Sequence, residues 1–225
     1  MNELDINMRL MPTKLPALAL RGISIFPSTL LNFEVARDKS LAAVNYALKN
    51  GKNIFLVTQK DIMVDNPSEK DLYKIGVVAQ VKQIIKGNNN ITRVIVEGKY
   101  RAKAMAVNTS GEYIVAEVVE YPMPKRKLLP TIVQEALLRK LKDSFDTYLS
   151  LIPPIARDIA LRIFNEDDPY EFAEMFAGNI AIPVKDKQHI LELSNVTKRL
   201  EYLLKVLEHE INILEIEKEI SDKVQ

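Results

Sequence analysis

Apolar and polar positions alternate in short runs as far as about residue 120, and this pattern predicts β-strands. Six runs rich in β-branched residues are bounded by turn-forming residues, and they span residues 29–36, 53–59, 76–86, 91–98, 101–108 and 113–121. The segments "GNNN" (87–90) and "NTSG" (108–111) lie between neighbouring runs and tolerate positive φ, so each is expected to close a hairpin. The strands on either side of each turn should therefore be antiparallel.

One helix is expected among these strands, beginning with Asp38 as its cap and ending at Asn50-Gly51. Leu41, Val44 and Leu48 recur at helical spacing and predict the face that packs against the sheet. Six strands, mostly antiparallel, and one helix favour a twisted sheet that curls into a partly closed barrel, with the helix over one opening.

Beyond residue 130 the spacing of apolar residues lengthens to threes and fours, which predicts helices. A first helix should occupy residues 133–148 and stop before Pro153-Pro154. A second should begin at Pro169, because Asp168 can cap it and proline suits the first helical position.

The last segment, residues 195–225, carries apolar residues at alternating steps of four and three, which is typical of one long helix. A helix of about thirty residues is roughly 45 Å long, and a small bundle cannot cover all of it. Its C-terminal part is therefore expected to project. Ile213 and Ile216, on its apolar face, are the candidate residues for self-association.

The stretch "YPMPKRKLLP", residues 121–130, separates the two patterns. Its three prolines cannot continue a central strand, and its basic cluster prefers solvent. The prediction is a fold of class α+β: a β-rich subdomain at 1–120, a linker at 121–130, and a helical bundle at 131–225 that ends in the long helix.

Composition limits the partners and the compartment. The chain has 31 basic and 30 acidic residues among 225, so its net charge of +1 gives no general attraction to nucleic acid or to an anionic membrane. It contains no cysteine, no run of about 18 apolar residues and no signal-peptide pattern at its start. A cytoplasmic protein with no membrane partner is expected.

No catalytic residue, metal site or cofactor site is expected in these residues. The sequence lacks a Gly-x-Ser-x-Gly elbow and a Gly-x-x-x-x-Gly-Lys-Ser/Thr phosphate loop. The two histidines, His189 and His209, fall in charged helical segments and are interpreted as solvated helix residues. The acidic clusters lack the ligand order of a calcium loop.

Several motifs in combination resemble the N-terminal domain of the Lon family of ATP-dependent proteases. They are "LPALALRGISIFPSTLLNFEVARDKSLAAVNYAL", "IFLVTQKD", "DLYKIGVVAQV", "RVIVEGKYRAK" and "RLEYLLKVLEHEINILEIEKEI", in an order that matches from about Leu15 to Gln225. The chain departs from the family pattern at Ala19, where proline is frequent, and at Gly22, where an acidic residue is usual. The second departure puts in doubt a carboxylate partner for Arg21.

The resemblance implies a PUA-like barrel followed by a bundle whose last helix leads to an ATPase ring and a Ser-Lys peptidase, neither of which lies in this sequence. It also implies that the parent protein is a hexamer that uses ATP and Mg²⁺. The role it implies for this chain is to bind unfolded or damaged polypeptides. A stand-alone Lon-domain binding protein is the alternative to a piece of such a protease.

Candidate substrate-binding residues follow from that role, because a surface that recognises unfolded chains should be apolar. Pro27 should keep its loop from pairing fully in a sheet, which would leave four apolar neighbours near an edge where an extended peptide could lie. The candidates are therefore Ile25, Phe26, Pro27, Leu30 and Leu31. The other interpretation is that these residues fill the barrel.

Two further candidates, Tyr121 and Met123, lie in the linker, which the alternative interpretation treats only as a tether. A second function, RNA binding, rests on basic residues of neighbouring predicted strands: Lys82, Lys86, Arg93, Lys99, Arg101 and Lys103. The balanced charge and the scarcity of aromatic residues for base stacking stand against it.

Overall fold

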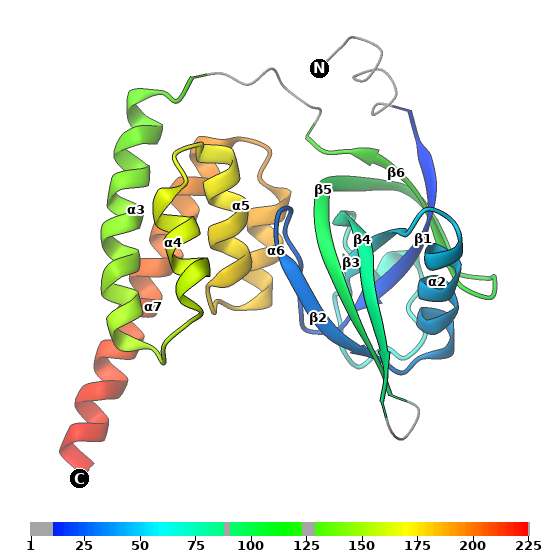
Figure 1. The fold of residues 1–225 in the computed structure, drawn as a ribbon, viewed down its shortest axis with the longest axis horizontal. Helices are drawn as coiled ribbons and strands as arrows, with labels where there is room; N and C mark the ends of the chain where they lie inside the picture. The colour runs from blue at the N-terminus through cyan, green and yellow to red at the C-terminus, as the bar shows by residue number, and fades with distance from the viewer. Residues whose placement is uncertain (1–10, 88–90, 123–128, 225) are drawn as a thin grey trace. The chain divides into compact units, whose positions relative to one another are not determined.

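The computed structural model describes residues 11–87, 91–122 and 129–224 (Figure 1). The chain divides into two compact units, Met1–Arg126 and Lys127–Gln225. The first contains the strands and the second contains five helices, so the predicted α+β class with a partly closed barrel is confirmed.

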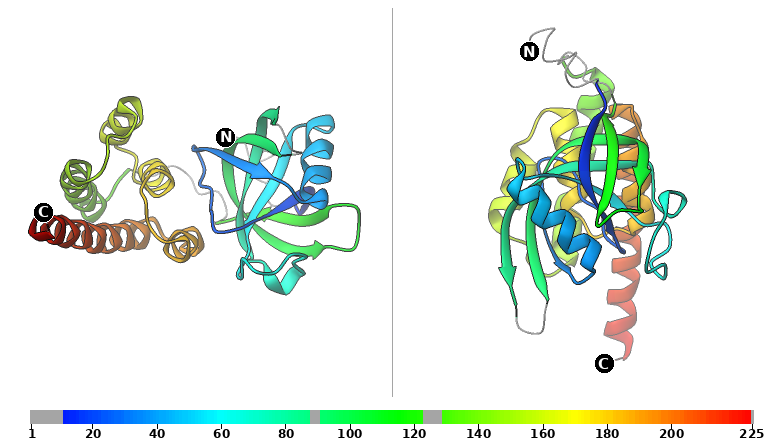
Figure 2. Two further views of the ribbon diagram at one scale, coloured as in Figure 1. Left: turned by 90° about the horizontal axis from the view of Figure 1, so that it is seen from below. Right: turned by 90° about the vertical axis from the view of Figure 1, so that its right-hand side faces the viewer.

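The first unit is built on six strands in the order β2-β5-β4-β3-β1-β6, and β5 pairs with β6 as well. This extra pairing closes five of the strands into a ring, and β2 lies outside the ring (Figures 1 and 2). The β1–β3 pair is parallel, and the other pairs are antiparallel. The strands are β1 (Thr13–Leu20), β2 (Leu30–Val35), β3 (Asn53–Thr58), β4 (Ile75–Lys86), β5 (Thr92–Asn108) and β6 (Ile114–Glu120).

The antiparallel pairs β4–β5 and β5–β6 confirm the two predicted hairpin partnerships. Two details of the prediction are corrected. The runs at 91–98 and 101–108 form the single long strand β5, whose first half pairs with β2 and whose second half pairs with β6. Strand β1 is not among the six predicted runs, and it is paired on both sides inside the ring.

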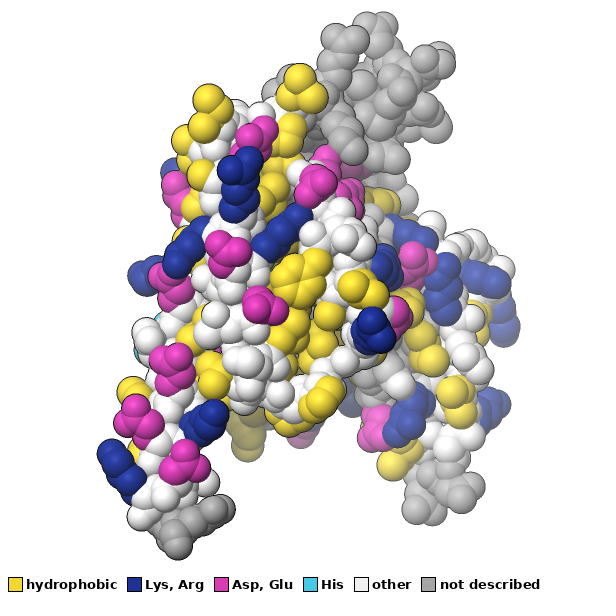
Figure 3. All heavy atoms as spheres, turned by 60° about the vertical axis from the view of Figure 1, so that its left-hand side comes forward, with side chains coloured by type: hydrophobic (Ala, Val, Ile, Leu, Met, Phe, Trp, Pro, Cys, Tyr) yellow, Lys and Arg dark blue, Asp and Glu magenta, His cyan; other side chains and the backbone are white. Residues whose placement is uncertain are grey.

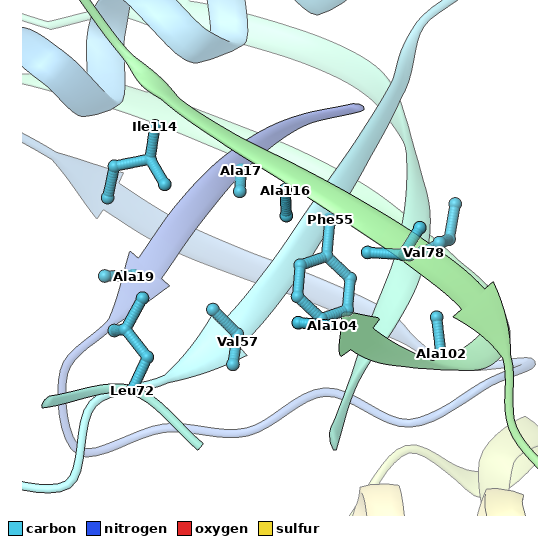
Figure 4. Packing of buried hydrophobic residues seen from close by; sticks show 11 residues of the cluster. Ala17, Ala19, Phe55, Val57, Leu72, Val78, Ala102, Ala104, Ile114 and Ala116 are labelled. Atoms are coloured by element: carbon cyan, nitrogen blue, oxygen red, sulfur yellow. The ribbon is translucent and has the colours of Figure 1, made fainter. Parts of the chain in front are cut away.

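The barrel interior is filled mainly by small side chains around one aromatic ring. Phe55 of β3 is fully buried, and Figure 4 shows alanines of neighbouring strands around it. Because a ring of five strands is narrow, one phenylalanine and small neighbours fill it where larger residues would clash. The alanines of this cluster are Ala17, Ala19, Ala102, Ala104 and Ala116.

Helix α2 (Asp38–Lys49) packs on the barrel, and a short 3₁₀ turn, η1 (Glu69–Asp71), precedes β4. The fully buried apolar residues of α2 are Ala43, Val44 and Ala47, whereas the predicted Leu41 and Leu48 are only half buried. Small residues face the sheet because they allow the helix a close approach. Asp38 lies in the first turn and does not cap the helix with its side chain.

The second unit consists of α3 (Ile132–Leu151), α4 (Arg157–Asn165), α5 (Pro169–Asn179), α6 (Val184–Glu192) and α7 (Val196–Val224). The predicted helices α3, α5 and α7 are confirmed, and Asp168 caps α5 by accepting hydrogen bonds from two backbone N–H groups. Helices α4 and α6 have nine residues each, and their short apolar patterns gave no prediction. In the core of the bundle Phe172 stacks on Phe176, and Phe145 contacts Phe176 edge to face.

None of the helices in the described part of the chain has the length and hydropathy needed to cross a membrane.

Candidate functional surface

The loop before β2 holds three of the predicted binding residues, and the structure buries all three. Ile25, Phe26 and Pro27 are core residues of the barrel unit, so they offer no surface to a visiting peptide in this structure. The interpretation that they fill the barrel is the one that the burial supports. Phe26 also lies 5.8 Å from the guanidinium of the buried Arg101, measured to the ring centroid.

Hydrogen bonds at both ends hold this loop in place. At one end, Thr58 of β3 donates to the carbonyl of Ile23 and lies 3.1 Å from the Ser24 hydroxyl. At the other, Ser28 N–H donates to Gly98 carbonyl oxygen at 3.0 Å, and Gly98 N–H donates to Thr29 carbonyl oxygen at 2.9 Å. The loop is thus hydrogen-bonded to strands β3 and β5.

Gly98 is needed for this contact. A Cβ atom at that position would lie 2.1 Å from the carbonyl oxygen of Phe26, a distance that no real side chain tolerates. The absence of a side chain therefore lets the loop lie directly against β5. This explains why the apolar run around Phe26 packs inward and does not line an open groove.

The other two predicted binding residues, Leu30 and Leu31, lie on strand β2. Leu30, at its start, is 70% exposed, and Leu31 is partly buried. Beyond them, Phe33 and Val35 face the core and Asn32 and Glu34 face solvent. Among the strands that the structure describes, only β5 pairs with β2.

The outer face of the sheet beside β2 carries charges that neutralise one another. Lys82 and Lys99 both lie 2.6 Å from a carboxylate oxygen of Glu97, and their hydrogen bonds to it hold its pKa below the ordinary value. Arg93 pairs with Glu34 at 3.1 Å. Three of the cations that could serve RNA are therefore already paired with carboxylates.

Arg101, a fourth, is buried. Phosphate binding at these four positions would have to break the pairs on the outer face and could not reach Arg101. Of the other two candidates, Lys86 is exposed and Lys103 is partly buried.

A second exposed apolar group lies on the segment between β3 and η1, and sequence reasoning missed it. Met63 is 80% exposed and Ile62 is more than half exposed. Ile62 lies beside Gly22, since a Cβ there would be 4.0 Å from the Ile62 Cγ2 atom. A signal was available in "QKDIMVDNP" (59–67), where three consecutive apolar residues, Ile62, Met63 and Val64, stand between polar ones.

Arginines hold this segment against the barrel. Arg21 donates to Asp65 at 2.7 Å, so the carboxylate partner that Gly22 does not supply comes from elsewhere in the chain. Arg37 donates to the side chain of Gln59 and to the backbone carbonyls of Asp65 and Ala19. Burial, followed by the charge of Arg21, lowers the pKa of Arg37.

A hollow of about 740 Å³ lies beside the start of α2. Its cations are Arg37, with the bonds given above, and Lys39, which donates to the carbonyl oxygen of Thr109. Oxygen atoms of the protein already accept hydrogen bonds from both cations, so an anion in the hollow would have to compete with them. Among the described residues no group of three His, Cys, Asp or Glu side chains could hold a metal ion.

The two linker candidates have different outcomes. Tyr121 is partly buried, and its N–H donates to the carbonyl oxygen of Arg101 at 2.9 Å. Met123 lies outside the described residues.

The long helix α7 has an anchored first half and an uncovered end. Its last buried residue is Ile211, and beyond it Ile213 is 37% exposed and Ile216 57% exposed. Ile220 is exposed as well and shares a face with these two, because steps of three and four return to one side of a helix. Figure 3 shows charged side chains along most of this end, with few apolar ones among them.

A buried ion pair anchors the first half. Arg199 of α7 donates to Glu174 of α5 at 2.9 Å, and both side chains are 0% exposed. Arg199 Nε also donates to the carbonyl oxygen of Leu193, and its guanidinium lies 5.1 Å from the ring centroid of Tyr170. These contacts fix the base of α7 in the bundle.

Residues 14–209 match the family model of the ATP-dependent protease La (LON) substrate-binding domain. The chain is 35% identical over 212 residues to a Lon protease of Syntrophomonas wolfei and 36% identical over 214 residues to one of Clostridioides difficile. These alignments cover 94% of this chain and 26% and 27% of the two relatives, so the chain spans about a quarter of their length.

Two solved structures have a similar fold. The N-terminal domain of the Mycobacterium avium complex Lon protease superimposes with a TM-score of 0.68 at 21% identity, covering 87% of this chain and 98% of that one. A Lon N-terminal domain protein from Xanthomonas campestris gives 0.61 at 14% identity, covering 86% and 98%.

Proposed function

This chain belongs to the family of LON substrate-binding domains, and we propose that it recognises unfolded or damaged polypeptides through exposed apolar side chains, without performing chemistry itself. Its partners would then be those polypeptides and the ATPase and peptidase domains of a Lon-type protease. ATP and Mg²⁺ would act in those domains, outside these 225 residues.

The observation that carries this proposal is the exposure of large apolar side chains on the barrel unit. Leu30, Ile62 and Met63 are each more than half exposed, although buried apolar residues fill the core of the same unit. An unfolded chain differs from a folded one in showing apolar side chains, so a surface of this kind would favour it. Methionine suits variable partners because its side chain is flexible and polarizable.

The test is a binding titration of fluorescently labelled casein, which is unfolded in solution, against the wild-type chain. The variants Leu30→Ser and Met63→Ser should weaken binding by roughly 5- to 30-fold if those side chains are covered by the substrate. The matched control is Lys86→Ser, which changes an exposed residue of β4 without removing apolar surface.

Salt separates this function from RNA binding. Apolar contacts should depend little on ionic strength, whereas phosphate contacts release counterions and weaken steeply with salt. Titrations at two salt concentrations with casein and with a labelled single-stranded RNA compare the two. Tight, salt-sensitive RNA binding without casein binding would overturn the proposal in favour of the RNA-binding alternative.

We also propose that the uncovered end of α7 contributes to homo-oligomer formation. Ile213 and Ile216 lie on one face of a helix that extends past its last buried residue, and such a face gains stability by packing against a second helix. In a full-length protease the same residues would meet neighbouring domains or subunits. Sedimentation velocity of the wild-type chain against the double variant Ile213→Ser, Ile216→Ser measures this role.

A further inference from the structure

The unpaired edge of β2 indicates how this chain would bind a substrate, an inference that rests on the proposed function. In the antiparallel β2–β5 pair, Leu30 lies opposite Glu97, and the register continues to Val35 opposite Thr92. The Gly98 N–H donates to the carbonyl oxygen of Thr29, and the Gly98 carbonyl oxygen accepts from Ser28 N–H, so Gly98 occupies a hydrogen-bonded position of the ladder opposite a bulge at residues 28 and 29. Hydrogen-bonded and non-hydrogen-bonded positions alternate along an antiparallel ladder.

The alternation fixes which backbone groups of β2 point toward β5. Leu31, Phe33 and Val35 bond to β5, and the N–H and carbonyl groups of Leu30, Asn32 and Glu34 point to the opposite side.

The other side of β5 agrees with this assignment. Gly87 N–H donates to the carbonyl oxygen of Ile91 at 2.9 Å, so in the first half of β5 the odd-numbered residues 93, 95 and 97 bond to β4 and leave the even-numbered ones to β2. No backbone hydrogen bond within the described residues engages the outward groups of Leu30, Asn32 or Glu34.

Edge strands in soluble proteins are usually protected by lysine, proline or a bulge. The sequence of β2, "LLNFEV", contains neither lysine nor proline, and its one charged residue, Glu34, is paired with Arg93. The part of β4 beyond its pairing with β3 differs, because it carries Lys82 and Lys86. Of these two edges, β2 is the less protected, and it begins at the exposed Leu30.

We propose that β2 binds an extended segment of an unfolded polypeptide as an added antiparallel or parallel strand. The outward N–H and carbonyl groups of Leu30, Asn32 and Glu34 bond to the backbone of the segment, and Leu30 contacts an apolar side chain of it. Backbone hydrogen bonds do not depend on the identity of the side chains, so this mode of binding accepts many sequences. It requires that the segment be unfolded. A folded substrate keeps its backbone groups paired and is excluded.

Hydrogen exchange of the wild-type chain, followed by NMR, tests the geometry. The probe is an eight-residue peptide rich in valine and threonine, acetylated at its N-terminus and amidated at its C-terminus. In the free protein the amides of Leu31, Phe33 and Val35 should exchange slowly and those of Leu30, Asn32 and Glu34 rapidly. With peptide at about 100 times its Kd, the second set should slow by roughly 100-fold.

Two substitutions at one position separate the backbone from the side chain. Asn32→Pro removes an outward N–H that β5 does not use, a change that edge strands tolerate, and should weaken peptide binding by roughly 3- to 10-fold. Asn32→Ala keeps the N–H and should bind as the wild type does. Slow exchange at Phe33 and Val35 in Asn32→Pro would show that β2 is still formed.

A peptide of the same sequence, N-methylated at four consecutive central residues, supplies the control on the ligand and should bind weakly or not at all.

The results distinguish strand addition at β2 from recognition by exposed apolar side chains alone. Strand addition is overturned if the outward amides still exchange rapidly with peptide bound and if Asn32→Pro and Asn32→Ala bind the peptide equally well. If Leu30→Ser weakens binding in that case, apolar recognition still stands. Absence of binding by both the peptide and casein overturns both. Outward amides that are already slow in a dimer of the free protein would show that a second copy occupies the edge, which also refutes the inference.

Discussion

Replacing Glu174 with glutamine should strongly destabilise the helical unit. The substitution keeps the size of the side chain but removes the negative charge that faces Arg199 at 2.9 Å. Both side chains are completely buried, so water cannot screen the cation that remains. Removing one partner of such a pair costs about 3–5 kcal/mol, because an uncompensated charge is left in the interior.

In a unit of about 100 residues, a loss of this size lowers the midpoint of thermal unfolding by roughly 15–25 °C. The measurement is urea and thermal unfolding followed by circular dichroism at 222 nm, where helices give most of the signal. Hydrogen exchange of peptides from residues 157–224 should accompany it, because a chain of two units need not unfold in a single step.

The matched control is the ion pair between Lys142 and Asp167, which has a similar length of 2.8 Å but an exposed carboxylate. Asp167 is 92% exposed, so Asp167→Asn should change the stability little. The double variant Glu174→Leu, Arg199→Met should recover most of the lost stability, since a buried pair replaced by apolar residues leaves no isolated charge. Equal effects of Glu174→Gln and Asp167→Asn would refute the reasoning from burial.

Two other predictions concern α7. Leu207→Ala should cost about 2–5 kcal/mol because Leu207 is fully buried, whereas Ile213→Ser with Ile216→Ser should cost about 1 kcal/mol at most and reduce self-association. Urea unfolding and sedimentation check these values, and equal losses would mean that the bundle covers the whole helix. The second prediction concerns Tyr202 of α7, whose hydroxyl donates a hydrogen bond to Asp186. This bond, with burial and the charge of Asp186, raises the pKa of Tyr202 to about 12. The resulting stabilisation should be complete below about pH 10, the unfolded value, and be lost as pH rises through 12; Asp186→Asn should return the titration, followed by absorbance at 295 nm, toward pH 10.

The sequence determined the elements whose signals are local. Turn residues at 87–90 and 108–111 predicted the two hairpin partnerships, and Asp168 before Pro169 predicted the start of α5. The repeat of apolar residues in 195–225 predicted both α7 and its uncovered end. Each of these depends on residues within a few positions of one another, which is why the sequence alone was sufficient.

Long-range contacts decided the candidate site. From the sequence, Phe26 and Leu30 were equivalent apolar residues on either side of Pro27. The tertiary structure buries Phe26, because the missing side chain of Gly98, about seventy residues later, lets the loop lie against β5. Leu30 stays exposed because it lies on the solvent face of β2, which it shares with Asn32 and Glu34, and not on the face of the buried Phe33 and Val35.

The free edge of β2 and its outward backbone groups follow from strand order, which depends on pairings between distant segments. Local apolar patterns set most of the strands and helices of this chain, and contacts between distant segments decided which apolar residues remain at the surface.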